Sequence, residues 1–500
     1  MPINEVISEV TNRIVQRSRD SRSQYLNNMQ DQLNSGPRRA HLTCGNQAHA
    51  YASTSKDKTS LSRTSNGNIG IVTAYNDMLS AHQPFESYPE IIRKAAREFG
   101  GTAQVAGGVP AMCDGVTQGQ PGMELSLFSR DVIALAASIA LSHNTFDTSI
   151  YLGVCDKIVP GLIISAATFG FLPAVFAPAG PMPSGIPNDK KSIVRQKFAT
   201  GEISRKELMK AEMASYHSPG TCTFYGTANS NQMLMEFMGL HLPGASFVTP
   251  NTPLRTALTE LATKRALEIT SLGNYFTPAC QILDEKAFVN GIVGLMATGG
   301  STNLVLHLPA MAKAAGIKLE LSDFNDISSV TPLMAKIYPN GLADVNHFHA
   351  AGGLNYMIAE LLEAGYLHND VQTIMGLGLE TYTKEPKLID GKIEFVPSST
   401  KSHNEKILRP VSDPFQKSGG IKLLDGNLGS CIIKISSVPM EKQIIEAPAR
   451  VFEAQEEVKS AFKNNELNTD LVIVVRFQGP VANGMPELHG LTPILSVLQE

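Results

Sequence analysis

The sequence contains no tryptophan, and it has only six cysteines and 6% aromatic residues among its 500 positions. The cysteines are too few and too scattered to form a disulfide framework. No apolar run is long enough to cross a bilayer, and the start of the chain lacks the apolar segment of a signal peptide. We therefore expect a reduced, cytoplasmic protein without a membrane partner.

The chain also has no marked excess of either charge. Its 42 Lys and Arg residues stand against 46 Asp and Glu residues, giving a formal net charge of −4 at pH 7. This balance provides neither the basic surface that nucleic acid requires nor an acidic tail, so no nucleic-acid partner is expected. An apolar content of 43% over this length is sufficient for a large core and two or more domains.

Strand-like and helix-like segments alternate from about residue 68. An apolar run at 69–73 precedes a helical pattern at 87–97, and a second run at 149–154 precedes a helical pattern at 161–170. Alternation at this spacing predicts βαβ units, and therefore an α/β fold with a largely parallel sheet. Residues 188–216 indicate a charged helical insertion.

Three segments define the predicted domain organisation. Residues 1–35 are expected to form a helical arm that docks on the protein body or on another subunit. An α/β domain is expected at 36–390, and a smaller strand-rich domain at 405–500. The segment 381–414, rich in Lys, Pro, Ser and Asp, marks the boundary between them. The apolar stripe of the arm consists of Val6, Ile7, Val10, Ile14 and Val15.

A thiol, a carboxylate and an amine stand side by side at Cys155, Asp156 and Lys157. They follow a predicted buried strand and precede a helix, which is where open α/β sheets bind their ligands. A soft thiolate beside a hard carboxylate points to two metals, iron in a cluster and a divalent cation. Taken alone, the three residues favour the simpler interpretation, a buried free cysteine beside a surface Asp-Lys pair.

Two further cysteines lie in loops that contain glycine. Cys222 follows Ser218-Pro219-Gly220 and leads into a helix predicted at 227–237. Cys113 and Asp114 repeat the pairing of a thiol with a carboxylate. Glycine lets the backbone approach a ligand closely. None of the spacings is CxxC or HExxH, so spacing alone does not establish a metal site.

These motifs resemble the signatures of the dihydroxy-acid and phosphogluconate dehydratases. The resemblance runs from about residue 10 to the end of the chain, and several segments resemble the 6-phosphogluconate branch specifically. The family signatures are CDKIVPG at 155–161, GTCTFYGTAN at 220–229, ATGGSTN at 297–303, Asp114-Gly115 and GMPE at 484–487, and the branch-specific segments are 74–84, 216–226 and 478–489.

The resemblance implies an α/β domain followed by a β-barrel-like domain, with the active site between them. The implied reaction removes water from 6-phosphogluconate to give 2-dehydro-3-deoxy-6-phosphogluconate, the entry step of the Entner–Doudoroff pathway. Hydroxide is a poor leaving group, so the reaction requires a Lewis acid. The expected partner is a phosphorylated sugar acid, and the expected assembly is a homodimer.

The resemblance also implies two sets of ligands. Cys155 and Cys222 would bind the cluster, with Cys113 as the expected third ligand and Cys44 as the alternative, and a 4Fe–4S cluster is expected over 2Fe–2S. Lysine in the better-described branch is carboxylated and becomes an oxygen ligand, the type that Mg²⁺ prefers, so modification of Lys157 is a hypothesis. The expected Mg²⁺ ligands are Asp114, Asp156, Lys157 and Glu487.

Two features depart from the family pattern. Some members have a further cluster cysteine after a Trp-Asn or Tyr-Asn pair, whereas here Tyr75-Asn76 leads to Ser80, Ala81 and His82. The Asp-Gly-Arg-x-Ser-Gly loop, whose serine acts as the base, does not occur in this sequence. We therefore expect a C-terminally incomplete member that binds the cluster and lacks the base, and the catalytic residue stays unassigned.

Other polar residues allow two interpretations each. His347 and His349 form a metal-binding pair or a polar turn, and residues 299–303 form an anion cradle or a helix cap. Lys190-Lys191 and Arg38-Arg39 meet a phosphate or, as we expect, are solvated surface charges. Cys280 and Cys431 are expected in the core. His82 and His489 contact the substrate or are structural.

Two rival functions stay open at this point. One is a dehydratase that acts on branched dihydroxy acids or unphosphorylated sugar acids. The other is a non-catalytic iron–sulfur redox or sensor protein. A redox protein needs no hard-metal site, so Asp114, Asp156 and Glu487 argue against it.

Overall fold

A computed structural model describes residues 2–479 and 488–499 of the chain. Within these residues, a parallel sheet has the strand order β2-β1-β3-β4. Strands β1 and β3 are buried along their whole length, which explains why each is a continuous apolar run. The predicted α/β class is confirmed. The strands are β1 (Asn68–Thr73), β2 (Thr102–Gly108), β3 (Thr148–Leu152) and β4 (Ala174–Phe176).

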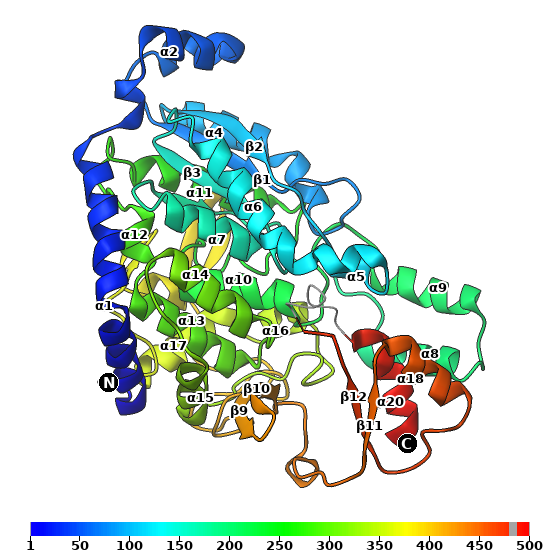
Figure 1. Ribbon diagram of the computed structural model, residues 1–500. Helices are drawn as coiled ribbons and strands as arrows, with labels where there is room; N and C mark the ends of the chain where they lie inside the picture. The colour runs from blue at the N-terminus through cyan, green and yellow to red at the C-terminus, as the bar shows by residue number, and fades with distance from the viewer. Residues whose placement is uncertain (1, 480–487, 500) are drawn as a thin grey trace.

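The connections decide which helices cover each face of the sheet (Figure 1). The chain moves from β1 to β2 in one direction, and then from β2 past β1 to β3 and β4 in the other. Right-handed crossovers therefore place α4 (Tyr88–Glu98) on one face, and α6 (Ser126–Leu141) and α7 (Ile158–Thr168) on the other. The carboxyl ends of β1 and β3 form the switch point at which such sheets bind ligands.

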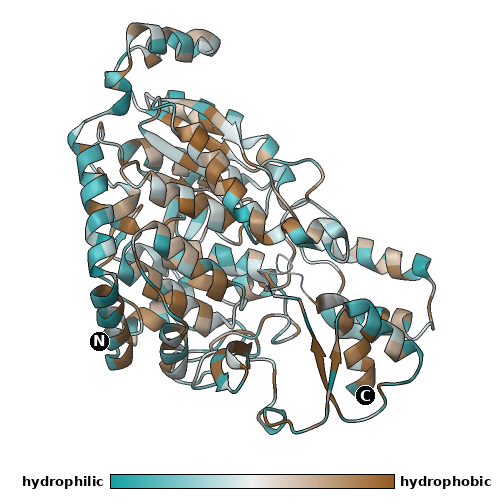
Figure 2. Ribbon diagram, viewed as in Figure 1, coloured by the Kyte–Doolittle hydropathy of each residue, from teal (hydrophilic) through white to brown (hydrophobic). Residues whose placement is uncertain are grey.

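A layer of helices extends the core beyond the sheet. Helix α10 (Thr227–Phe237) packs on α13 (Glu285–Thr298), and α14 (Leu304–Ala314) packs on α7. Every residue of α7 from Ile158 to Ile163 is buried, and the helix is correspondingly hydrophobic in Figure 2. No described helix combines the length and the apolar character that a membrane span requires.

The N-terminal helix α1 (Glu5–Asn34) lies along the edge of the body in Figure 1. Ile7, Val10 and Ile14 are buried, and the helix packs on α13 and on α15 (Leu321–Val330). The predicted apolar stripe therefore docks on the same chain, although Val15 is exposed. Beyond it, α2 (Cys44–Tyr51) projects away from the body.

Strands in the last quarter of the chain form separate pairs. Strands β7 (Lys384–Ile389) and β8 (Lys392–Pro397) form a hairpin that packs on α11 (Pro253–Glu268). Leu408 is also fully buried, so the segment predicted as a boundary is not a free linker. The chain continues with the antiparallel hairpin of β9 (Ile421–Gly426) and β10 (Gly429–Lys434).

A second, smaller core lies near the C-terminus. It contains Phe452, Val458, Ala461, Leu467 and Leu491. The parallel strands β11 (Ala449–Phe452) and β12 (Val472–Val475) contribute to it together with α18 (Gln455–Lys463). The predicted charged insertion consists of α8 (Asn188–Ala199) and α9 (Arg205–Ser215), and α20 (Thr492–Gln499) packs on α8.

Candidate functional site

The turn that carries Cys155, Asp156 and Lys157 lies between the carboxyl end of β3 and α7. Cys155 has a φ of +73°, a left-handed conformation that side-chain-bearing residues rarely adopt. Such strain persists only where the surroundings hold it in place. The Asn231 amide nitrogen of α10 donates hydrogen bonds to the carbonyls of Cys155 (3.0 Å) and Asp156 (2.9 Å). Asn231 therefore holds the turn in the strained form.

His82 holds the residue before this turn. Its ring is fully buried, and burial lowers the pKa of His82 to about 4, so the ring is neutral at pH 7. The Nε2 atom lies 3.1 Å from the Val154 carbonyl, to which the neutral ring donates a hydrogen bond. Of the two roles predicted for His82, the structural one explains this geometry.

The Cys222 loop is fixed by the same helix that holds Cys155. Asn229 of α10 donates from its amide nitrogen to the carbonyls of Cys222 (2.7 Å) and Phe224 (2.8 Å). Gly220 has a φ of +131°, and a Cβ atom there would lie 2.3 Å from the Met182 nitrogen. Only glycine fits this close approach, so the loop before Cys222 depends on it.

Cys113 follows β2 and immediately precedes α5 (Asp114–Thr117). Burial raises the pKa of Cys155 well above its usual value, and the negative charges of Cys113, Asp156 and Cys222 raise it further. Burial, followed by the charge of Cys113, raises the pKa of Cys222 to about 12. These effects indicate that the fold brings the loops of Cys113, Cys155 and Cys222 within electrostatic range of one another. Cys44 instead lies on the projecting α2 (Figure 1).

This donor set fits an iron–sulfur cluster. Buried thiols with raised pKa values become thiolates when a metal centre offsets their charge, so cluster binding and deprotonation are coupled. A cluster binds its thiolates on separate irons, further apart than the ligands of a single ion. Residues 2–479 and 488–499 contain no group of three His, Cys, Asp or Glu side chains placed to hold one ion.

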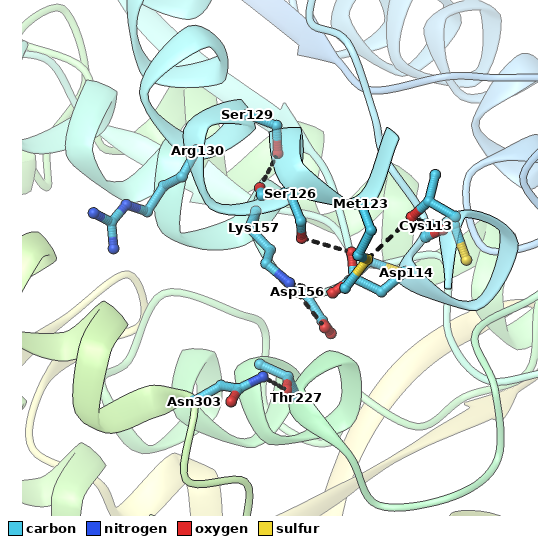
Figure 3. Close-up of polar contacts among 12 residues, drawn as sticks. Cys113, Asp114, Met123, Ser126, Ser129, Arg130, Asp156, Lys157, Thr227 and Asn303 are labelled. Carbon is cyan, nitrogen blue, oxygen red and sulfur yellow. Dashed lines mark hydrogen bonds and ion pairs between the residues drawn. The ribbon is translucent and has the colours of Figure 1, made fainter. Parts of the chain in front are cut away.

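Lys157 lies between two carboxylates (Figure 3). Its side chain is 1% exposed and forms ion pairs with Asp114 and, at 3.5 Å, with Asp156. Ser126 of α6 donates a hydrogen bond of 2.8 Å to the other oxygen of Asp114. The ammonium therefore occupies the place between carboxylates that suits a divalent cation. Carboxylation of Lys157 would exchange this competing charge for oxygen ligands. The predicted ligand Glu487 lies outside the described residues.

Two residues of the site carry no signal in the sequence. Arg130 follows Ser126 by one turn of α6, and its Nη1 atom lies 3.2 Å from Nδ1 of His307 on α14. His307 is fully buried. Burial lowers the pKa of His307 well below its ordinary value, and the charges of Arg130 and Lys157 lower it further, so the ring is neutral. In Figure 3 the Arg130 side chain extends away from Asp114 and Asp156.

The motif at 297–303 joins the start of α14 to the start of α10. Gly299 ends α13 in the left-handed conformation, with a φ of +62°. The Thr227 and Ser301 hydroxyls lie 2.9 Å apart, and Asn303 donates a hydrogen bond of 3.0 Å to Thr227. In Figure 3, Asn303 and Thr227 lie across from Asp156. The motif therefore contributes a polar wall that faces the predicted metal ligands.

Several predictions for single residues were wrong. His347 and His349 lie on a helix, α16 (Val345–Ala350), rather than in a polar turn, and His347 pairs with Asp344 at 2.7 Å. Arg39 is buried and pairs with Asp147 at 3.0 Å instead of being solvated. Cys431 is exposed because it lies on the open hairpin of β9 and β10.

The prediction for the lysine pair holds for one member only. Lys190 is exposed, as expected, whereas Lys191 is buried. Cys280 is buried, as predicted for a core cysteine. His489 belongs to a short helical turn, Leu488–Leu491, and its side chain is outside the described part of the molecule.

Thiols, carboxylates and a buried lysine at the switch point of an α/β sheet define a metal-dependent enzyme site. Two family models match the chain, the dihydroxy-acid/6-phosphogluconate dehydratase N-terminal model at residues 66–382 and its C-terminal counterpart at 406–500. The chain therefore belongs to the dihydroxy-acid/6-phosphogluconate dehydratase family, as its motifs predicted. Members of this family are hydro-lyases that use iron–sulfur clusters.

Curated relatives come from both branches of the family. The phosphogluconate dehydratase of Rhizobium meliloti (strain 1021) is 61% identical over 502 residues, covering 100% of this chain and 83% of the relative. That of Escherichia coli (strain K12) is 56% identical over 497 residues, with coverages of 99% and 82%. The dihydroxy-acid dehydratase of Caldanaerobacter subterraneus subsp. tengcongensis is 33% identical over 437 residues, with coverages of 86% and 75%.

Proposed function

We propose that this chain removes water from 6-phosphogluconate to form 2-dehydro-3-deoxy-6-phosphogluconate, the entry step of the Entner–Doudoroff pathway. The similarity to phosphogluconate dehydratases, at 61% and 56% identity, exceeds the 33% identity to the dihydroxy-acid dehydratase. The observation that carries the proposal is the arrangement of Cys113, Cys155 and Cys222 beside the carboxylates that flank Lys157. A redox protein would not need this second, oxygen-rich half of the site.

The three cysteines would hold a 4Fe–4S cluster that keeps one iron open. Asp114, Asp156, Glu487 and a carboxylated Lys157 would hold Mg²⁺. When bound, the cluster and the cation supply the Lewis acidity that the departure of hydroxide requires.

The protein supplies positioning and charge around these groups. Ser126 orients Asp114, and Asn231 fixes the peptide between Cys155 and Asp156. The guanidinium of Arg130 would attract the anionic substrate over a distance, and the neutral ring of His307 accepts a hydrogen bond from it at Nδ1.

The proposal extends to domains, assembly and location. The two family models leave a gap between residues 382 and 406, which supports a C-terminal domain at 405–500 after the α/β domain at 36–390 and the arm at 1–35. Exposed Phe128, Leu135 and Ile139 on α6 offer an apolar surface for a homodimer. A cytoplasmic location suits the free cysteines of the site.

The test is an anaerobic reconstitution of the cluster, followed by addition of Mg²⁺ and 6-phosphogluconate and detection of the 2-keto acid. Because the Asp-Gly-Arg-x-Ser-Gly serine does not occur in this sequence, we expect the loaded chain to bind 6-phosphogluconate in preference to unphosphorylated or branched dihydroxy acids. Formation of product would show that another group serves as the base. Cys155→Ser should lose both iron and binding of 6-phosphogluconate, whereas Cys431→Ser, which changes an exposed cysteine of β10, should keep both. A loaded cluster with reversible redox behaviour and no binding of 6-phosphogluconate would contradict the proposal.

A further inference from the structure

The insertion formed by α8 and α9 buries a lysine that the reaction site does not use. Lys191 is 8% exposed. Its Nζ atom donates a hydrogen bond of 2.8 Å to the Tyr216 hydroxyl and lies 4.1 Å from the centre of the same ring. No carboxylate of the described residues lies within ion-pair distance of this nitrogen. The nearby Glu212 is instead bound by Arg195 through two hydrogen bonds of 2.6 and 2.9 Å.

The charges of Glu212 and Cys222 favour the ammonium form of Lys191, but neither group pairs with it directly. A buried ammonium without a direct ion pair is costly, so an incoming anion is a suitable partner. Burial, followed by the charge of Arg195, lowers the pKa of Lys191 to about 8, and the group is still mostly protonated at pH 7. The Ser218 hydroxyl, two residues beyond Tyr216, is buried and has no hydrogen-bond partner among the described residues. An ammonium and hydroxyl groups are the donors that phosphate oxygens accept from.

The location fits one end of the substrate. Tyr216 and Ser218 belong to the segment that continues directly into Cys222, and the positive charge of Lys191 acts to lower the pKa of that thiol. A six-carbon sugar acid has its carboxylate on C1 and its phosphate on C6. When C2 and C3 lie at the reaction site, the phosphate must therefore lie within one substrate length of it.

We propose that Lys191, together with the hydroxyl groups of Tyr216 and Ser218, binds the phosphate group of the substrate and selects phosphorylated over unphosphorylated sugar acids. This inference rests on the proposed function. It gives the α8–α9 insertion a role in specificity, because the insertion supplies both Lys191 and the approach to Tyr216.

The test compares Lys191→Gln with Lys190→Gln. The two variants remove the same charge from adjacent positions of α8, but Lys190 is exposed. Calorimetry of the cluster-loaded chain under anaerobic conditions measures the affinities for 6-phosphogluconate and for gluconate. Loss of a charge-assisted hydrogen bond predicts that Lys191→Gln weakens binding of 6-phosphogluconate by about 10- to 100-fold. Gluconate binding should not change, and Lys190→Gln should match the unmodified chain.

Further measurements separate phosphate binding from a structural role. Lys191→Arg keeps the charge and should restore part of the preference for the phosphorylated acid. Inorganic phosphate should compete with 6-phosphogluconate in the unmodified chain and not in Lys191→Gln. If Lys191→Gln does not fold, Tyr216→Phe is the second variant, because it removes the hydroxyl and keeps the ring. It should weaken the binding of 6-phosphogluconate and leave the binding of gluconate unchanged.

Two results would overturn the inference. Lys191→Gln could keep its preference for the phosphorylated acid while iron content or cluster absorbance changes, which would mean that Lys191 only balances the charge of the cluster. Alternatively, the unmodified chain could bind neither acid, which would overturn the proposed function together with the inference.

Discussion

Replacing Asn231 by alanine tests how the fold prepares Cys155 for metal binding. Asn231 is fully buried, and its amide nitrogen donates to the carbonyls of Cys155 and Asp156 at 3.0 and 2.9 Å. Cys155 has a φ of +73°, and such a conformation costs about 1–3 kcal/mol unless its surroundings hold it. Asn231→Ala removes two of the contacts that hold it.

The expected loss follows from the buried groups. Each part-buried carbonyl that loses its partner costs about 1–3 kcal/mol, so the two together give a total destabilisation of about 2–6 kcal/mol. If about 2 kcal/mol of this loss falls on the Cys155 turn, cluster affinity falls by roughly 30-fold. Asn231→Ala should therefore contain much less iron per chain after anaerobic reconstitution.

Asn355→Ala is the matched control. Asn355 is also buried, and its amide nitrogen donates to two carbonyls, those of Tyr382 (2.9 Å) and Lys384 (2.7 Å), in a region that contains none of the candidate ligands. The midpoint of thermal unfolding should fall by similar amounts in both variants, and only Asn231→Ala should lose iron. Equal iron contents in the two variants would refute the view that Asn231 prepares the site.

Three further predictions concern the backbone, a buried carboxyl group and the lysine. Gly220→Ala should lower the free energy of unfolding by about 3 kcal/mol or more, because its Cβ would meet the Met182 nitrogen. Gly201 has a φ of +80° and open space around it, so Gly201→Ala should lower the free energy of unfolding by only about 1 kcal/mol, as measured by thermal unfolding. Burial raises the pKa of Asp284 to about 6 from 3.8, so the stability contribution of its carboxyl group is complete below 3.8 and lost as pH rises through 6. The free energy of unfolding of Asp284→Asn, relative to that of the unmodified chain, should therefore rise by about 1–3 kcal/mol from about pH 4 to about pH 7. The same relative free energy at about pH 4 and about pH 7 would contradict this assignment. Native mass spectrometry of the intact protein should show one added CO₂ that Lys157→Arg abolishes, and an unmodified mass under CO₂-saturated conditions would exclude carboxylation.

The parallel sheet could be predicted because its strands have a strong local signal. The runs at 69–73 and 149–154 are buried on both faces as β1 and β3, so the sequence shows them as continuous apolar segments. The helix predicted at 227–237 matches α10 for a similar reason, since a polar first turn precedes a continuous buried body. The boundary segment 381–414 was harder to interpret, because polar residues alternate there with the few that pack on α11.

The sequence alone determined the type of chemistry, through thiols and carboxylates at the ends of buried strands and through motifs specific to one family. Only the tertiary structure decided which residues meet. Cys113 and Cys222 are more than a hundred positions apart, and Arg130 reaches His307 from another helix. Lys190 and Lys191 are identical in type and adjacent in sequence, yet only one is buried. Burial and proximity arise from packing between distant segments, so local composition does not record them.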